Sequence, residues 1–245
     1  MNKTRIFVTA YPKSGSTWLT RLLADVLNCP AGGSHPSEDK KELASEGWDR
    51  PEPYVVCKGH YRINKAGALN PRPHELNTDL ITDDHVVHLV RDPRDIAVSA
   101  ALYHEKDLSE IIAGMVQGSL YGLPPWAAYV DRWRRLILKN NRPVLSVMYE
   151  EFLRHTGREV EILLRTIGIP FDLDRLPDAV HRQGFTQRLA QISGDTKMAK
   201  SKRNLNAKLM RHGVAGDWRK HFSTKQLDWV MRYWQHEMEL LGYER

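Results

Sequence analysis

The segment that most constrains this chain is a short polar stretch between a buried strand and an amphipathic helix. The run Ile6–Ala10 is largely apolar and β-branched, which predicts a strand over residues 5–10. Apolar residues then recur at helical spacing, which predicts a helix over residues 16–28. A strand, a glycine-containing turn and a helix N-terminus together form an anion site. Free backbone N–H groups and the positive end of the helix dipole point into such a turn.

The turn carries side chains that suit an anion. The segment reads Tyr11-Pro12-Lys13-Ser14-Gly15-Ser16-Thr17-Trp18. Lys13 supplies a full positive charge, and the hydroxyl groups of Ser14, Ser16 and Thr17 are hydrogen-bond donors. These residue types predict that a group bearing phosphate or sulfate binds here. The octet alone leaves an ordinary strand-to-helix turn as the alternative.

The order of residues in the octet differs from the nucleoside-triphosphate loop, in which Gly-Lys-Ser/Thr opens the helix. Here the lysine precedes the glycine by two positions, and no glycine opens the loop. The octet resembles instead the 5′-phosphosulfate loop of sulfotransferases that use 3′-phosphoadenosine 5′-phosphosulfate (PAPS). The resemblance implies that the cofactor is bound by Lys13, Ser14, Gly15, Ser16 and Thr17. It also implies that Trp18 stacks on adenine, with packing of Trp18 in the core as the alternative.

Composition limits the class of protein without choosing a ligand. The 245 residues suffice for one domain, and no linker or repeat divides the chain, so we expect a single domain over 1–245. The net charge of +6 suits a polyanionic small ligand, nucleic acid or an acidic membrane surface equally well. Cys29 and Cys57 are too few for a disulfide scaffold and lack metal-ligand spacing, and Cys57 is expected in the core. No apolar run approaches the roughly 18 residues of a membrane span, and no signal-peptide pattern opens the chain, so a cytoplasmic protein is expected.

Buried strands alternate with helices along the chain. Further strands are expected over residues 54–57, 86–90 and 144–148, and a loop over 30–52. Helices are expected from about residue 93 and over 125–138, 157–167 and 224–241. This order predicts an α/β fold with a central parallel sheet flanked by helices. In such sheets ligands bind beyond the carboxyl ends of the strands, and the motifs below all fall there.

A histidine follows the second expected strand in the sequence Lys58-Gly59-His60. An imidazole can remove a proton from an attacking hydroxyl near neutral pH, and Lys58 can offset charge that develops on an oxyanion. Taken alone, such a histidine is more often a surface or structural residue. The tripeptide resembles the sulfotransferase Lys-x-His motif, which implies that His60 is the catalytic base and that Lys58 assists the transfer.

The third expected strand ends at an arginine. Asp92 is expected to cap the following helix, with Pro93 at its first position and Asp95 completing a capping-box-like arrangement. This helix start, with Arg91 in a surface ion pair, is the plain alternative to a binding role. The stretch from Leu89 to Ser99 resembles the sulfotransferase 3′-phosphate segment, which implies that Arg91 and Ser99 bind the 3′-phosphate.

Further correspondences lie later in the chain, and those of Tyr149 and Phe185 are the weaker ones. The segment 211–218 resembles the family's Arg-Lys-Gly-x-x-Gly-Asp-Trp, which implies that it covers the nucleotide and binds the 3′-phosphate through Arg211, His212 and Gly213. His212 replaces the usual Lys, which makes that contact weaker or dependent on pH. Tyr149 resembles a tyrosine that reaches the adenine side. Phe185 resembles an aromatic residue that contacts adenine, although Gly184 stands where Ser is usual.

The motifs span residues 11–218 in family order, and together they identify a PAPS-dependent sulfotransferase with a P-loop-like phosphosulfate loop. The resemblance implies in-line transfer of a sulfuryl group to a hydroxyl or amine acceptor, with His60 as base and with Lys58 and Lys13 stabilising charge. The product is adenosine 3′,5′-bisphosphate (PAP), and no metal is required. The expected acceptor is a small molecule, glycan or lipid, and no nucleic acid partner is expected. An ATP-dependent kinase and a non-enzymatic basic binding module are the rival interpretations.

Overall fold

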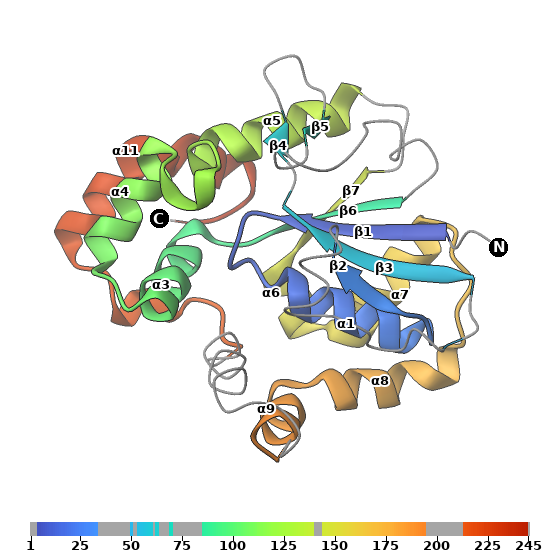
Figure 1. Cartoon of the computed structure of the whole chain (residues 1–245). Coiled ribbons are helices and arrows are strands. Elements are labelled where there is room, and N and C mark those ends of the chain that lie inside the picture. Colours follow the sequence, from blue (N-terminus) through green and yellow to red (C-terminus); the bar gives the residue numbers. More distant parts are fainter. Residues whose placement is uncertain are drawn as a thin grey trace.

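The computed structural model describes residues 4–33, 50, 53–60, 62–63, 69–70, 85–139, 144–194 and 213–244. Its centre is a five-stranded, all-parallel sheet with the strand order β2-β3-β1-β6-β7 (Figure 1). The strands are β1 (Thr4–Ala10), β2 (Ala31–Gly33), β3 (Tyr54–Gly59), β6 (His85–Val90) and β7 (Val144–Met148). A separate antiparallel pair consists of β4 (Arg62–Ile63) and β5 (Leu69–Asn70). The predicted α/β fold, with its central parallel sheet, is confirmed.

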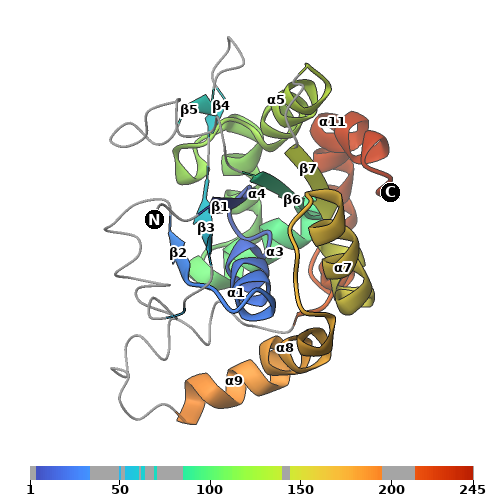
Figure 2. The same ribbon diagram turned by 90° about the vertical axis from the view of Figure 1, so that its right-hand side faces the viewer.

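Helices cover both faces of the sheet because the central strand β1 is apolar on both sides. Ile6 and Val8 belong to one buried cluster, and the intervening Phe7 belongs to another. The first cluster includes side chains of α1 (Ser16–Val26), α6 (Tyr149–Arg154), α7 (Thr156–Thr166) and α8 (Leu176–Gln183). The second includes side chains of α3 (Pro93–His104), α4 (Leu108–Gln117), α5 (Trp126–Lys139) and α11 (Thr224–Leu240). Figures 1 and 2 show these two groups on opposite sides of the sheet.

The predicted elements agree with the structure in kind and differ in extent. The expected helices over 125–138, 157–167 and 224–241 correspond to α5, α7 and α11. Strand β3 continues through Lys58 to Gly59, so Lys58 lies within the strand and not after it. The loop predicted over 30–52 begins with the short edge strand β2, which pairs with β3; residues 34–49 and 51–52 lie outside the described residues. Cys57 is buried in the core, as expected.

Sequence patterns did not predict several shorter helices. Besides α4, α6 and α8, these are α9 (Phe185–Gly194) and the 3₁₀ turns η3 (Leu120–Gly122), η4 (Leu173–Arg175) and η5 (Asp217–Lys220). Helix α8 lies beside α1, and α9 follows α8 (Figure 2). Among the described residues no helix is both long and apolar enough to cross a membrane.

A buried carboxylate joins α8 to α1. Asp25 accepts hydrogen bonds from Arg182 Nη2 at 2.8 Å and from Gln183 Nε2 at 2.8 Å. Burial alone would raise the pKa of Asp25, but these bonds and the nearby arginine charges outweigh burial and lower the pKa. Helix α9 begins at Phe185, two residues after Gln183, so these contacts lie close to its start.

We expect Asp25→Asn to lower the free energy of unfolding at pH 7 by about 1–2 kcal/mol, because the charge-assisted bonds to Arg182 are weakened. A carboxylate whose pKa is lowered by folding stabilises the fold above its unfolded pKa of about 3.9 and loses that contribution as the pH falls. Urea denaturation of both proteins between pH 7 and pH 3 measures this. The difference in unfolding free energy should shrink towards acid pH, and a difference that stays constant would contradict this role.

Candidate active site

The turn between β1 and α1 leaves the N-terminus of α1 without a side-chain cap. Gly15, the N-cap residue of α1, has φ +94°, and α1 has neither a side-chain cap nor an acidic residue in its first turn. Lys13 also has a positive φ, of 71°, a strained backbone conformation that is concentrated at functional sites. The first N–H groups of α1 therefore face the turn without a side-chain acceptor from the described residues, as an anion site requires.

Glycine is required at position 15 for two reasons. Its positive φ is unfavourable for any residue with a Cβ, and an added Cβ would lie 2.6 Å from Tyr149 Cε2. Tyr149 begins α6 directly after β7, so the residue that follows the last strand contacts the turn that follows the first.

Gly15→Ala is expected to lower the free energy of unfolding by about 2 kcal/mol or more, because strain and overpacking add. Chemical denaturation measures this loss. Gly157→Ala is the matched control, because its added Cβ has no neighbour within 4 Å and position 157 lies in helix α7. The control should be neutral or slightly stabilising. Equal losses in the two variants would show that the turn does not need glycine.

Strand β3 directs two of the predicted catalytic residues to the turn. Lys58 is buried, and its Nζ donates a hydrogen bond to Thr17 Oγ1 at 3.1 Å. His60 follows the strand, and its Nδ1 lies 2.8 Å from the carbonyl oxygen of Ala10, the last residue of β1. A carbonyl oxygen only accepts, so Nδ1 carries the proton and the lone pair of the neutral ring is on Nε2.

Arg91 approaches the same turn from the end of β6. Its Nη1 donates to the carbonyl oxygen of Lys13 at 3.0 Å, and its guanidinium carbon lies 4.4 Å from the centre of the Tyr149 ring. Two buried polar atoms, Arg91 Nε and Ser14 Oγ, have no hydrogen-bond partner in the described part of the chain. The turn thus contains donors that a phosphate or sulfate oxygen can satisfy.

Trp18 and Tyr149, both predicted on the adenine side, pack against each other, and Phe185 lies next to Gly213 of the 3′-phosphate motif. Trp18 packs edge-on against Tyr149 with ring centroids 5.8 Å apart, and its Nε1 donates to the Gln183 carbonyl at 3.1 Å. Trp18 is half-buried and touches the core, so core packing holds for part of its ring. An added Cβ on Gly213 would lie 3.3 Å from the Phe185 ring, which places these two predicted residues in contact.

The remaining predicted residues are placed less fully. Ser99 lies half-buried in the second turn of α3. Ser16 and Thr17 form the first turn of α1. Arg211 and His212 lie outside the described residues.

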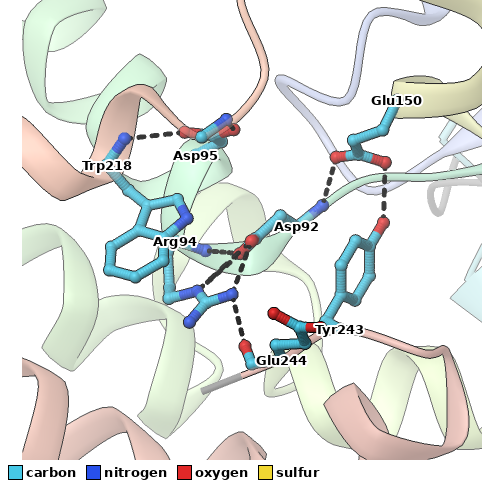
Figure 3. A network of polar contacts seen from close by, with 8 residues as sticks. Asp92, Arg94, Asp95, Glu150, Trp218, Tyr243 and Glu244 are labelled. Atoms are coloured by element: carbon cyan, nitrogen blue, oxygen red, sulfur yellow. Dashed lines mark hydrogen bonds and ion pairs between the residues drawn. The ribbon is translucent and has the colours of Figure 1, made fainter. Parts of the chain in front are cut away.

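The start of α3 confirms one prediction and corrects another. Asp92 caps the helix by accepting from the Arg94 amide at 2.9 Å, with Pro93 at the first helical position. The predicted capping role of Asp95 is wrong. Its carboxylate instead accepts from the amides of Gly216 and Trp218 (Figure 3), while the Asp92 amide donates to Glu150 Oε1 at 2.9 Å.

Sequence reasoning missed a residue beside the loop lysine. Lys13 Nζ lies 3.7 Å from the centre of the Tyr103 ring, a cation–π contact. Tyr103 is four residues after Ser99 in α3, so helical spacing from the 3′-phosphate motif could have indicated it. Next to it, His104 Nε2 and Tyr121 Oη are 2.8 Å apart. No group of three or more His, Cys, Asp or Glu side chains that could hold a metal occurs in the described ranges.

Comparison with known proteins places this geometry in a family. A sequence model of the sulfotransferase domain matches residues 3–242. Human sulfotransferase 2A1 is 24% identical over 257 residues, which cover 98% of this chain and 86% of that protein. The 3-alpha-hydroxysteroid sulfotransferase of Cavia porcellus is also 24% identical, over 246 residues that cover 93% of this chain and 81% of that protein.

Solved structures share the same fold. Mouse sulfotransferase SULT7A1 complexed with PAP superposes with a TM-score of 0.70 at 21% identity, covering 97% of this chain and 86% of that one. Retinol dehydratase in complex with androsterone and PAP has a TM-score of 0.66 at 15% identity, covering 97% of this chain and 81% of that one. With a family match over nearly the whole length and a common fold, the chain belongs to the sulfotransferase family.

Proposed function

We propose that this enzyme transfers a sulfuryl group from PAPS to the hydroxyl group of a small-molecule acceptor and releases PAP. The observation that carries the proposal is the convergence of Lys58, His60 and Arg91, from the ends of two different strands, on the turn that follows β1. One anion site with a basic imidazole beside it suits transfer of an anionic group to an acceptor that must lose a proton.

The residues of the turn fit the cofactor. The uncapped N-terminus of α1, the partnerless Ser14 Oγ and the partnerless Arg91 Nε offer donors to its anionic groups. Trp18, Tyr149 and Phe185 offer ring surfaces for adenine. The PAP complexes of SULT7A1 and retinol dehydratase, which share this fold, support the choice of nucleotide.

The proposed reaction is an in-line displacement at sulfur. The acceptor oxygen attacks, its proton passes to His60 Nε2, and the new O–S bond forms as the S–O bond to the 5′-phosphate breaks. Lys58 and Lys13 offset the negative charge that gathers on the bridging oxygen, which leaves with PAP. The protein thus acts by positioning and neutralising charge, as in phosphoryl transfer, and no bond to an enzyme residue is needed.

We propose an alcohol of the steroid or retinoid size class as the acceptor. The support is the printed names of relatives: hydroxysteroid sulfotransferases among the sequences, and retinol dehydratase bound to androsterone or retinol among the structures. A cytoplasmic location and a single domain over 1–245 remain predictions from the sequence.

Incubation with ³⁵S-labelled PAPS and a panel of sterols, retinoids, phenols, amines and sugars tests this function. The expected result is label on a hydroxylated apolar compound with stoichiometric release of PAP, without added metal. Label on phenols, amines or sugars alone would replace the proposed acceptor class. Phosphate transfer from ATP and Mg²⁺, with no transfer from PAPS, would instead indicate the kinase.

A further inference from the structure

The segment 213–218, named here the glycine segment, is tied to the start of α3 through one carboxylate. Asp95 Oδ2 accepts from the Gly216 amide at 2.7 Å, and Asp95 Oδ1 accepts from the Trp218 amide at 2.9 Å (Figure 3). Both oxygens of one buried side chain therefore hold two amides that lie 121 and 123 residues further along the chain. Gly213 to Ala215 are exposed, whereas Asp217 and Trp218 are buried, so the tie holds one end of the segment.

A second contact fixes the same end of the glycine segment. The guanidinium carbon of Arg94 lies 3.8 Å from the centre of the Trp218 ring, and Arg94 is only 2% exposed. Asp92 holds Arg94 in place, since its Oδ2 accepts from Arg94 Nη2 at 2.8 Å and its Oδ1 from Nε at 3.0 Å. Arg94 Nη2 also donates to the Glu244 carbonyl at 2.8 Å.

Glu150 of α6 links the turn that carries Asp92 and Arg94 to Tyr243 through two hydrogen bonds. Glu150 accepts from the Asp92 amide through Oε1 and from the Tyr243 hydroxyl through Oε2, each at 2.9 Å. Glu150 directly follows Tyr149, whose ring touches Arg91 and the Gly15 position. The residues 91–95 are thus held by several contacts, with Arg91 at one end and the tie to the glycine segment at the other.

We propose that Asp95 is a positioning residue that sets the glycine segment at a fixed distance from Arg91, so that the two enclose the nucleotide's 3′-phosphate. The inference rests on the proposed function. Asp95 does not touch the nucleotide in this arrangement; it acts through the amides of Gly216 and Trp218. Gly213, which is expected to contact the 3′-phosphate, lies at the exposed end of the segment, which Asp95 does not tie.

Asp95→Asn is the direct test. An amide has one oxygen, and its NH₂ group would face a second N–H donor, so one of the two bonds is lost and replaced by a donor–donor contact. Calorimetric titration should show PAP binding weakened about tenfold or more, and binding of adenosine 5′-phosphate, which lacks the 3′-phosphate, weakened less than about threefold. In turnover, KM for PAPS should rise with a smaller change in kcat.

Two further variants separate positioning from general damage. Asp131→Asn removes the same charge from a partly exposed carboxylate in α5 that pairs with Arg134 and Arg135, and it should leave both affinities unchanged. Gly216→Ala strains the segment from its own side, because Gly216 has φ +78°, a conformation that is unfavourable for a residue with a Cβ. Gly216→Ala should also reduce the ratio of PAP to adenosine 5′-phosphate affinity, even if Asp95→Asn fails to fold.

The outcomes of these titrations are distinguishable. If the native protein binds PAP no better than adenosine 5′-phosphate, the proposed function fails before any variant is compared. If native binding prefers PAP but folded Asp95→Asn and Gly216→Ala keep the native affinity ratio, the positioning role of Asp95 is wrong. If Asp95→Asn weakens the binding of both nucleotides equally, the hydrogen bonds of Asp95 to Gly216 and Trp218 have only a structural role.

Discussion

Replacing His60 with alanine is expected to reduce sulfuryl transfer by about 10²–10⁴-fold, which is the usual contribution of a general base. The hydrogen bond from Nδ1 to the Ala10 carbonyl fixes the ring beside the phosphosulfate turn and leaves the lone pair on Nε2, where the acceptor's proton would go. The nucleotide contacts come from other residues, so the dissociation constant for PAP should change less than about threefold. Initial rates with labelled PAPS and calorimetric titration with PAP measure the two quantities.

The control for this variant is His155→Ala, which removes an exposed imidazole far along the chain, beside α7. It should leave the rate unchanged. An unimpaired rate in His60→Ala would remove His60 from the role of base. A loss of PAP affinity as large as the loss of rate would make His60 a residue that shapes the cofactor loop.

Arg91→Ala is expected to weaken PAP binding by about a hundredfold. The guanidinium can form two charge-assisted hydrogen bonds to a phosphate, each contributing about 1.5–3 kcal/mol. Arg91 Nη1 also donates a hydrogen bond to the Lys13 carbonyl oxygen at 3.0 Å. The variant therefore loses a contact that orders the turn after β1, as well as the proposed 3′-phosphate contact. Titrations with PAP and with adenosine 5′-phosphate separate these effects, because only the first carries a 3′-phosphate.

The matched control is Arg135→Ala, which removes an exposed guanidinium from α5 and should leave both affinities as they are. We expect the ratio of the two affinities to fall in Arg91→Ala. An unchanged ratio, with both nucleotides weakened alike, would assign Arg91 to loop structure and leave the 3′-phosphate to other residues.

Much of the fold followed from local patterns. The apolar runs at Ile6–Ala10 and 86–90 could be recognised because these strands are buried on both faces of the sheet. The run at 144–148 could be recognised from its apolar residues, although this edge strand is only partly buried. The carboxyl ends of parallel strands lie at one edge of the sheet. Lys58, His60 and Arg91 were expected at or near such strand ends, which predicted that their side chains lie close together. Helical boundaries were close to the observed ones where Asp92-Pro93 and Ser223 supply caps.

What could not be predicted depends on contacts between distant segments. Asp95 looked like a capping residue because it stands three positions after Asp92, whose amide its carboxylate could accept from. Its carboxylate accepts instead from the amides of Gly216 and Trp218, and the Asp92 amide donates to Glu150. The need for glycine at position 15 comes partly from Tyr149, which is 134 residues away by number. Short helices such as α8 have few turns in which a period can show, and α8 is fixed by Asp25 of another helix.

The central claim is that the turn after β1, together with Arg91 and the glycine segment, binds a doubly phosphorylated adenosine without a metal. A thermal-unfolding titration with PAP in the presence of a chelator tests it most directly, with adenosine 5′-phosphate and ATP plus Mg²⁺ in parallel. We expect a large rise in Tm with PAP alone, a small one with adenosine 5′-phosphate, and no additional rise from Mg²⁺. Stabilisation by ATP and Mg²⁺ but not by PAP would contradict it.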